Sequence, residues 1–276
     1  SNVLTMLDLA GIPLYSKERG EEIPFILAGG PCVCNMEAVA DFFDLAILGE
    51  GEEIIHLLTE ELGKWKKAGK PGGKKGFLEN AARIQGIYVP SFYEPIYGED
   101  GRIQEIKVLN ENAAYPVQKQ VVKDLESLSI SLDPVVPFLL PVHDRIHLEI
   151  FRGCTRGCRF CQAGMIYRPV RERKPETLIA AAKAIAESTG YDEAALMSLS
   201  SADYSCLPEL IDALQEELKA KKVNVSLPSL RLDSFSVELA QKVQKVRKSG
   251  LTFAPEAGTQ ILRDVINKGV TEEHLI

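Results

Sequence analysis

Three cysteines within one short stretch are the residues of this chain whose types and spacing are best suited to chemistry. Cys154, Cys158 and Cys161 have CxxxCxxC spacing, and they follow residues 146–151, whose alternating apolar pattern predicts a strand. Glycines at positions 153, 157 and 164 allow the backbone to curl around a large group. The stretch therefore predicts a loop that turns three thiolates toward one centre.

The number of thiolates separates two kinds of metal site. A structural zinc site takes four ligands, commonly from two CxxC pairs, and the chain has no second CxxC. An iron–sulfur cluster is held by cysteine thiolates, and three of them leave one iron open for another ligand. Ordinary thiols in a solvated basic loop are the third interpretation. The spacing favours a cluster.

Cationic side chains crowd the same stretch. Glu172 is the single acid among seven of them: Arg152, Arg156, Arg159, Arg168, Arg171, Arg173 and Lys174. Positive neighbours favour the thiolate, which is the form that binds metal. We expect these arginines to serve the site.

The pattern CxxxCx(aromatic)C, with Phe160 as its aromatic residue, resembles the signature of the radical S-adenosylmethionine (radical SAM) superfamily. The resemblance implies that the three cysteines bind a [4Fe–4S] cluster whose fourth iron is chelated by S-adenosylmethionine. Reduction then splits the sulfonium and releases a 5′-deoxyadenosyl radical. The run from His143-Asp144-Arg145 to Arg171-Glu172-Arg173 resembles the bacterial fusion proteins in which a cobalamin-binding-like domain precedes a radical SAM barrel.

Strands and helices alternate after residue 145, which predicts βα units with parallel strands. The predicted strands are 146–152, 194–199, 223–227 and 251–254, and the predicted helices are 175–188, 207–221, 237–248 and 259–266. The family resemblance implies a partial (β/α) barrel, of which this chain would carry about four units. In such a barrel the active site lies at the carboxyl ends of the strands, where the cysteines follow the first one.

Polar residues follow the other predicted strands, and the resemblance implies that they bind S-adenosylmethionine. Ser200, Ser201 and Asp203 follow the second strand, where the family often has a Gly-Gly-Glu-like segment that this chain lacks. Ser229 and Arg231 follow the third strand, and Glu256 follows the fourth. A guanidinium at Arg231 suits the methionine carboxylate, because charge-assisted hydrogen bonds to carboxylates are strong. With Phe160, these are the predicted cofactor-binding residues; helix caps and turns are the alternative roles.

The N-terminal part predicts a different domain. Residues 1–70 alternate strand and helix and resemble the C-terminal part of a cobalamin-binding-like, Rossmann-like α/β domain with a parallel sheet. The Asp-x-His-x-x-Gly pattern that supplies a cobalt-ligating histidine is absent. Residues 71–144 read as a linker with a β-hairpin over 87–97 and 103–109, with 68–86 as a mobile loop, and 145–276 as the N-terminal part of the barrel.

Composition bounds where the protein works and what it binds. Net charge is −7, so the chain lacks a global nucleic-acid footprint, and it has neither an apolar run of membrane-spanning length nor a signal peptide. Six cysteines, three of them clustered, favour a reducing compartment, so we expect a cytoplasmic protein. Its first and last residues predict a chain truncated at both ends. The open edge of a four-unit sheet predicts pairing into a dimer.

These observations predict a radical SAM enzyme of unassigned reaction, served by an electron donor such as flavodoxin or ferredoxin. One alternative is a methylthiotransferase or cobalamin-dependent methyltransferase acting on RNA or protein. The other is a non-catalytic metal- or cluster-binding module. We expect cobalamin to be absent from this chain, although the resemblance admits it in a full-length protein.

Overall fold

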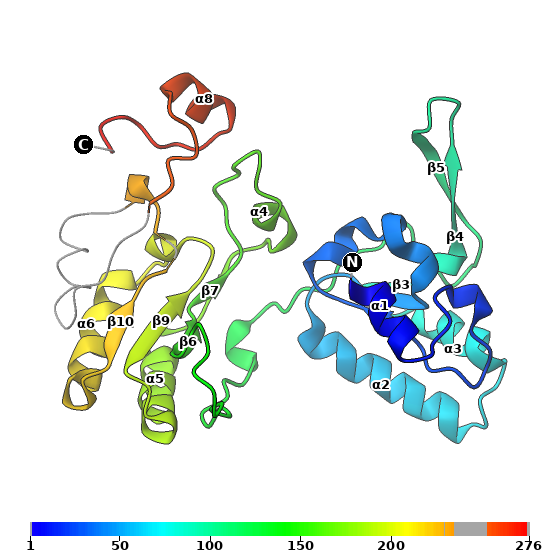
Figure 1. The fold of residues 1–276 in the computed structure, drawn as a ribbon, viewed down its shortest axis with the longest axis horizontal. Helices are drawn as coiled ribbons and strands as arrows, with labels where there is room; N and C mark the ends of the chain where they lie inside the picture. Colours follow the sequence, from blue (N-terminus) through cyan, green and yellow to red (C-terminus); the bar gives the residue numbers. More distant parts are fainter. Residues whose placement is uncertain (1, 229, 235–252, 275–276) are drawn as a thin grey trace. The chain divides into compact units, whose positions relative to one another are not determined.

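A computed structural model describes residues 2–228, 230–234 and 253–274. The chain divides into two compact units, Ser1–Val122 and Lys123–Ile276. The boundary between the two units falls inside residues 71–144, the segment that the sequence predicts to be a linker. Each unit has a sheet and a hydrophobic core of its own (Figure 1).

The first unit is built on a three-stranded sheet of order β1-β2-β3. β1 (Leu27–Ala28) and β2 (Leu45–Ile47) are parallel, as the strand–helix alternation predicts. β3 (Ile87–Tyr88) is antiparallel to β2; the sequence predicted these residues to begin the hairpin, so their place in this sheet was not expected. The other elements before β3 are α1 (Asn2–Leu9), the 3-10 helices η1 (Ser16–Glu18) and η2 (Pro31–Phe42), α2 (Gly51–Lys67) and α3 (Gly73–Ala81).

Helix α3 corrects the mobile loop expected over residues 68–86. Lysines and glycines dominate its sequence, but Phe77 is buried and packs against Trp65 and Phe25, with ring centroids 5.6 and 4.6 Å apart. Burial of an aromatic side chain stabilises a short helix far more than its intrinsic propensity disfavours it.

The hairpin predicted after this helix is present. β4 (Tyr93–Tyr97) and β5 (Ile103–Val108) pair antiparallel, after the 3-10 helix η3 (Pro90–Phe92). The segment that follows returns to the sheet, where Gly49 bridges Gln120. A Cβ at Gly49 would lie 2.1 Å from the Gln120 carbonyl oxygen, so only glycine admits this approach.

The second unit contains a sheet of order β10-β9-β6 whose neighbouring strands are parallel. β6 is Ile146–Glu149, β9 is Glu193–Met197 and β10 is Asn224–Ser226, so the first three predicted strands are confirmed. The remaining elements are η4 (Leu125–Ser127), β7 (Phe151–Arg152), α4 (Ala163–Ile166), β8 (Arg171–Glu172), α5 (Pro175–Thr189), η5 (Ser201–Asp203), α6 (Leu207–Leu218), η6 (Lys219–Lys221), η7 (Leu232–Ser234) and α8 (Gln260–Val265).

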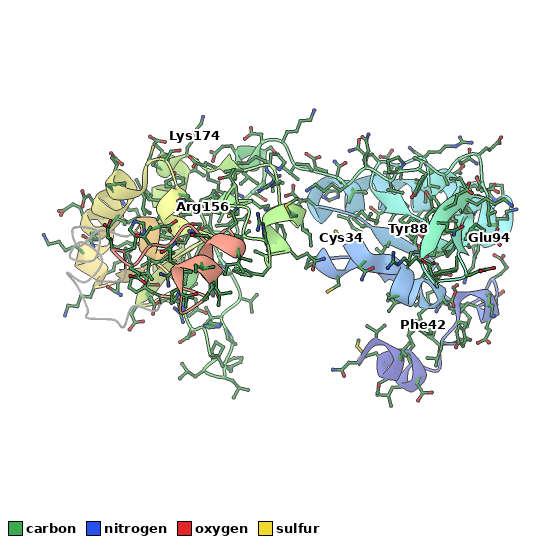
Figure 2. All side chains as sticks on the ribbon, turned by 90° about the horizontal axis from the view of Figure 1, so that it is seen from above. Cys34, Phe42, Tyr88, Glu94, Arg156 and Lys174 are labelled. Carbon is green, nitrogen blue, oxygen red and sulfur yellow. The ribbon has the colours of Figure 1, made fainter. Side chains whose placement is uncertain are left out.

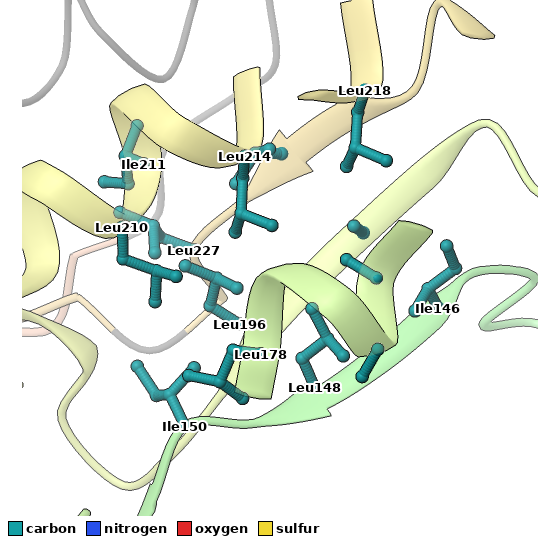
Figure 3. Packing of buried hydrophobic residues seen from close by; sticks show 14 of the residues in the cluster. Ile146, Leu148, Ile150, Leu178, Leu196, Leu210, Ile211, Leu214, Leu218 and Leu227 are labelled. Carbon is teal, nitrogen blue, oxygen red and sulfur yellow. The ribbon is translucent and has the colours of Figure 1, made fainter. Parts of the chain in front are cut away.

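Helices α5 and α6 pack against the sheet through a shared core (Figure 3). Ile146 and Leu148 of β6 are buried, whereas His147 between them is exposed, because successive side chains of a strand point to opposite faces. Leu178 of α5 and Leu210 of α6 complete the core between helix and sheet. A parallel α/β sheet is therefore confirmed for this unit.

The fourth predicted βα unit is not part of the described sheet. The helix expected over 237–248 lies outside the described residues, as do the first two residues of the strand expected over 251–254. Phe253 and Ala254 are described and belong to no strand. Among the described helices, none is both long and apolar enough to span a membrane.

Candidate functional site

The three cysteines lie on one closed excursion of the second unit, residues 153–170, which we call the cysteine loop. It leaves the sheet at β7 and returns at β8, and these strands pair antiparallel, with Phe151 opposite Glu172. The loop thus begins just past the carboxyl end of β6 and returns before α5, as the predicted active-site face requires.

Two glycines give the loop its shape. Gly153 and Gly157 have φ values of 96° and 70°, in the region that side chains disfavour. A Cβ at Gly153 would lie 2.7 Å from the Pro169 carbonyl oxygen, so the two ends of the loop approach closely only because this residue is glycine.

The thiols of Cys154, Cys158 and Cys161 are free and half-buried. The Cys161 amide donates to the Cys158 carbonyl at 3.0 Å, which forms a tight turn between these two cysteines. Nη1 of Arg231 lies 3.5 Å from the Cys158 sulfur and donates to it. In the described part of the chain, no three His, Cys, Asp or Glu side chains are gathered as ligands of a single ion.

Charged side chains from three strand ends meet beside the loop. Arg156 (labelled in Figure 2) donates to the carboxylate of Asp203, with Nε at 2.8 Å, and lies 3.5 Å from that of Asp233. Arg231 also donates to Asp233, at 2.9 and 2.7 Å. Asp203 follows β9 and Asp233 follows β10, and the carboxyl ends of parallel strands share one edge of a sheet.

The two carboxylates are held in their charged form. Burial would raise the pKa of Asp203, but the hydrogen bond and charge of Arg156 outweigh it, and the pKa is lowered. For Asp233, burial likewise opposes the hydrogen bond and charge of Arg231, and the pKa is again lowered. Asp233 therefore bridges two guanidinium groups, one on the cysteine loop and one after β10.

The structure brings together several of the predicted S-adenosylmethionine contacts, most of which have protein partners. Ser200 and Ser201 are buried at the end of β9, and the Ser201 hydroxyl donates to the Leu196 carbonyl at 3.2 Å. Ser229 lies outside the described residues. Arg231 has contacts with Asp233, Cys158 and, at 2.8 Å, the Lys268 carbonyl.

Glu256 and Phe160 share one neighbour, Lys268. Its ammonium is 3.1 Å from a Glu256 oxygen and 5.9 Å from the centroid of the Phe160 ring, which is 55% exposed. Glu256 has a φ of 69°, a backbone conformation that costs energy for residues other than glycine. Lys268 is buried, and no local sequence pattern identified it.

The arginines of this stretch have two kinds of contact, and that they serve the site stays a prediction. Arg168 donates to the Cys154 carbonyl at 3.1 Å and so contacts the cysteine loop. Arg173 is buried and donates instead to the Leu125 and Leu128 carbonyls, which anchors the segment that enters the unit.

Two family comparisons match this architecture. Residues 148–276, which contain the cysteine loop, match the family described as the radical SAM superfamily, and residues 1–90 match radical SAM proteins, N-terminal. The chain therefore contains a segment of the radical SAM superfamily, residues 148–276. This match confirms the superfamily that the three-cysteine motif predicts.

The chain is also similar to individual proteins. An uncharacterized protein of Methanocaldococcus jannaschii is 28% identical over 256 residues, which cover 90% of this chain and 46% of that protein. The cobalamin-dependent S-adenosylmethionine radical enzyme OxsB, solved with aqua-cobalamin and S-adenosylmethionine, has 16% identity and a TM-score of 0.53. The structure of OxsB with aqua-cobalamin alone has a TM-score of 0.52. In both cases the match covers 91% of this chain and 33% of OxsB, and it shows a shared fold.

Proposed function

We propose that the chain is part of a radical SAM enzyme that uses a [4Fe–4S] cluster to cleave S-adenosylmethionine reductively, forming a 5′-deoxyadenosyl radical. The observation that carries this proposal is the cysteine loop itself. Three free thiols, at the spacing of the family signature, lie on one glycine-bent loop beyond β6, inside the segment that matches the superfamily.

The residues present fit such a cluster. Thiolates are the ligands that iron–sulfur clusters use, and Cys154, Cys158 and Cys161 are free rather than disulfide-bonded. The donor at Cys158, Nη1 of Arg231, stabilises negative charge on that sulfur. When bound, the cluster would deliver an electron to the sulfonium of S-adenosylmethionine; a flavodoxin or ferredoxin would resupply it.

We further propose that S-adenosylmethionine lies against the strand ends, in contact with Phe160, Ser200, Ser201, Asp203, Ser229, Arg231 and Glu256. Support comes from the convergence of Asp203 and Arg231 beside the loop through their shared neighbours Arg156 and Asp233. Arg231 and Glu256 would exchange protein partners, Asp233 and Lys268, for the carboxylate and ribose of the ligand.

The domain arrangement is part of the same proposal. Residues 1–70 would be the C-terminal part of a cobalamin-binding-like domain, 71–144 a linker with a hairpin, and 145–276 the N-terminal part of a partial (β/α) barrel. The second unit supports this arrangement with three parallel strands. Helices α5 and α6 cover one face of their sheet, and His147 of β6 is exposed on the other face. A dimer would form by pairing along the open edge of the sheet.

A second candidate function is cobalamin-dependent radical chemistry, including methyl transfer to RNA or protein. It is favoured by the fold shared with OxsB, a cobalamin-dependent enzyme. Cobalamin retention through gel filtration separates the two candidates. We expect this chain to lose the vitamin's red absorbance, because the pattern that supplies a cobalt-ligating histidine is absent.

Anaerobic reconstitution with iron and sulfide tests the main proposal. We expect about four irons and four sulfides per chain and a paramagnetic reduced state. Conversion of Cys154, Cys158 and Cys161 to alanine should abolish this uptake, while the same change at Cys206, outside the loop, should preserve it. Full iron in the triple variant would reject the proposal, and zinc in place of iron would favour a structural module. Release of 5′-deoxyadenosine on reduction tests the cleavage step.

A further inference from the structure

The cysteine loop is held from a turn that is about 110 residues away in the sequence. This turn, residues 265–268, forms the C-terminal end of helix α8, and Figure 1 shows α8 beside the segment that carries α4. The amide of Arg159, between two of the cysteines, donates to the Ile266 carbonyl at 2.9 Å, and its guanidinium donates to the Val265 carbonyl.

Asn267 makes the side-chain contact of this turn with the loop. Its Nδ2 donates to the Gly157 carbonyl at 2.9 Å and lies 3.4 Å from the Arg156 carbonyl. The Gly157 carbonyl belongs to the peptide that leads into Cys158, so its orientation sets that of the Cys158 backbone.

The turn itself has independent support. Arg263 is 1% exposed and donates to the Val270 carbonyl at 2.8 Å and the Ala257 carbonyl at 3.0 Å, which joins the two sides of α8. The Lys268 amide closes the helix end on the Arg263 carbonyl at 2.9 Å. Asn267 therefore extends from a fixed turn toward a loop that contains two left-handed glycines.

The backbone conformation of Asn267 offers a second explanation for an asparagine at this position, and a test has to distinguish it from the contact with the loop. Its φ is 55°, and asparagine is favoured after a helix because it tolerates the left-handed region. Glycine tolerates this region at least as well, but it has no side-chain amide. Glycine would therefore satisfy the backbone conformation at this position, whereas the hydrogen bond to the Gly157 carbonyl requires the side-chain amide of asparagine.

We propose that Asn267 is a positioning residue for the cluster-binding loop, and that its side-chain amide orients the peptide before Cys158 for metal ligation. This inference rests on the proposed function, since it assigns Cys158 to the cluster. It adds a residue that the family motif does not contain and that lies outside the predicted S-adenosylmethionine contacts.

The test compares Asn267→Gly and Asn267→Ala in the full chain with a matched control, Lys222→Gly. Asn267→Gly removes the amide and keeps the left-handed backbone, whereas Asn267→Ala removes the amide and strains the backbone as well. Lys222 has a φ of 57° beyond η6, so its glycine variant makes the same backbone change on another element, at the C-terminal end of η6.

Two measurements are made on each variant. The first is the rate at which a chelator removes iron from the anaerobically reconstituted protein, together with the paramagnetic resonance spectrum of the reduced cluster. The second is the alkylation rate of Cys158 in metal-free, reduced protein, resolved by peptide mass spectrometry, with Cys206 as the internal reference. Thermal unfolding shows that each variant is folded.

Asn267→Gly should release iron about two- to tenfold faster than the wild type, as expected for the loss of one hydrogen bond, and should alter Cys158 alkylation by a similar factor. Lys222→Gly should match the wild type in both. Wild-type behaviour of Asn267→Gly in both measurements overturns the inference. If the wild type binds no cysteine-dependent iron, the proposed function fails, and Cys158 alkylation alone then decides the role of Asn267.

Discussion

Both units contain arginine–aspartate pairs with little solvent exposure, but the pairs have different neighbours. In the first unit, Arg19 lies 3.3 Å from Asp44, and both contact backbone: Arg19 donates to the Phe42 carbonyl at 3.0 Å, and Asp44 accepts from the Ile26 amide at 2.7 Å. In the second unit, Arg156 and Arg231 share Asp233 beside the cysteine loop.

The difference separates an ion pair that joins backbone segments from ion pairs beside the cysteine loop, where we propose that a ligand binds. The Arg19 side chain is fully buried, and its contacts hold the segment before β1 against the end of η2. The paired arginines and aspartates of the second unit follow strand ends, and Arg231 also donates to a thiol, that of Cys158. Burial of charge thus fixes the fold in one unit and the loop geometry in the other. Four predictions test this contrast.

Arg19→Ala should have the largest effect, on the first unit. It leaves the Asp44 carboxylate buried without its cation, which typically costs about 3–5 kcal/mol. We expect the unfolding free energy of the first unit to fall by this order, measured by denaturant titration with Trp65 fluorescence, since Trp65 lies in that core. Iron uptake by the second unit should be unchanged. Loss of iron uptake in a variant with an intact second unit would contradict the contrast.

Arg231→Ala should affect ligand binding with little effect on the first unit. If Arg231 holds S-adenosylmethionine, the lost charge-assisted contact costs about 1.5–3 kcal/mol, or one to two decades in affinity. Calorimetric titration of reconstituted protein measures it. The control is Lys219→Ala, whose side chain is exposed on η6 and pairs with Glu216 nearby on α6. Equal affinity in the Arg231 variant and the wild type would exclude this contact.

Asp233→Asn should loosen the cysteine loop rather than unfold the unit. The substitution keeps the shape of the side chain but removes the charge that pairs with Arg231 and Arg156. We therefore expect the unfolding free energy of the second unit to fall by about 1 kcal/mol and iron to be released faster. Iron-release kinetics measure this, with Glu216→Gln on the exposed face of α6 as the control. The same release rate in both variants would show that Asp233 has no role in holding the loop.

Glu126→Gln should have the smallest effect and should depend on pH. Glu126 accepts from Thr177 Oγ1 at 2.6 Å and from the Lys174 amide at 2.9 Å, and the Thr177 hydrogen bond leads the interactions that lower its pKa. A lowered folded-state pKa stabilises the fold above the unfolded value of about 4.3, and this stabilisation is lost as pH falls through the folded-state pKa. Between pH 6 and 3 the wild type should therefore lose more stability than Glu126→Gln, as measured by urea titration at each pH. Parallel losses would contradict it.

Local patterns in the sequence determined much of the second unit. Alternation predicted β6, β9 and β10, and helical spacing with proline near the start predicted α5 and α6. The three-cysteine motif located the loop, because ligand spacing within eight residues is itself a local property. The superfamily assignment follows from that motif and agrees with the family match.

Tertiary contacts decided what local patterns left open. Glycine and lysine in residues 73–81 favour a loop, yet burial of Phe77 against Trp65 makes this segment a helix. The pairing direction of β3 likewise depends on where the chain returns to β2, which no short pattern encodes.

The same holds for the residues around the thiols. Asp233 resembles an ordinary turn residue and Asn267 an ordinary residue at a helix end, and only the folded chain shows that one bridges two arginines and the other reaches the Gly157 carbonyl. The sequence determined which atoms could bind a cluster. The tertiary structure decided which distant side chains orient them, because a hydrogen bond between residues 110 positions apart leaves no local periodicity in the sequence.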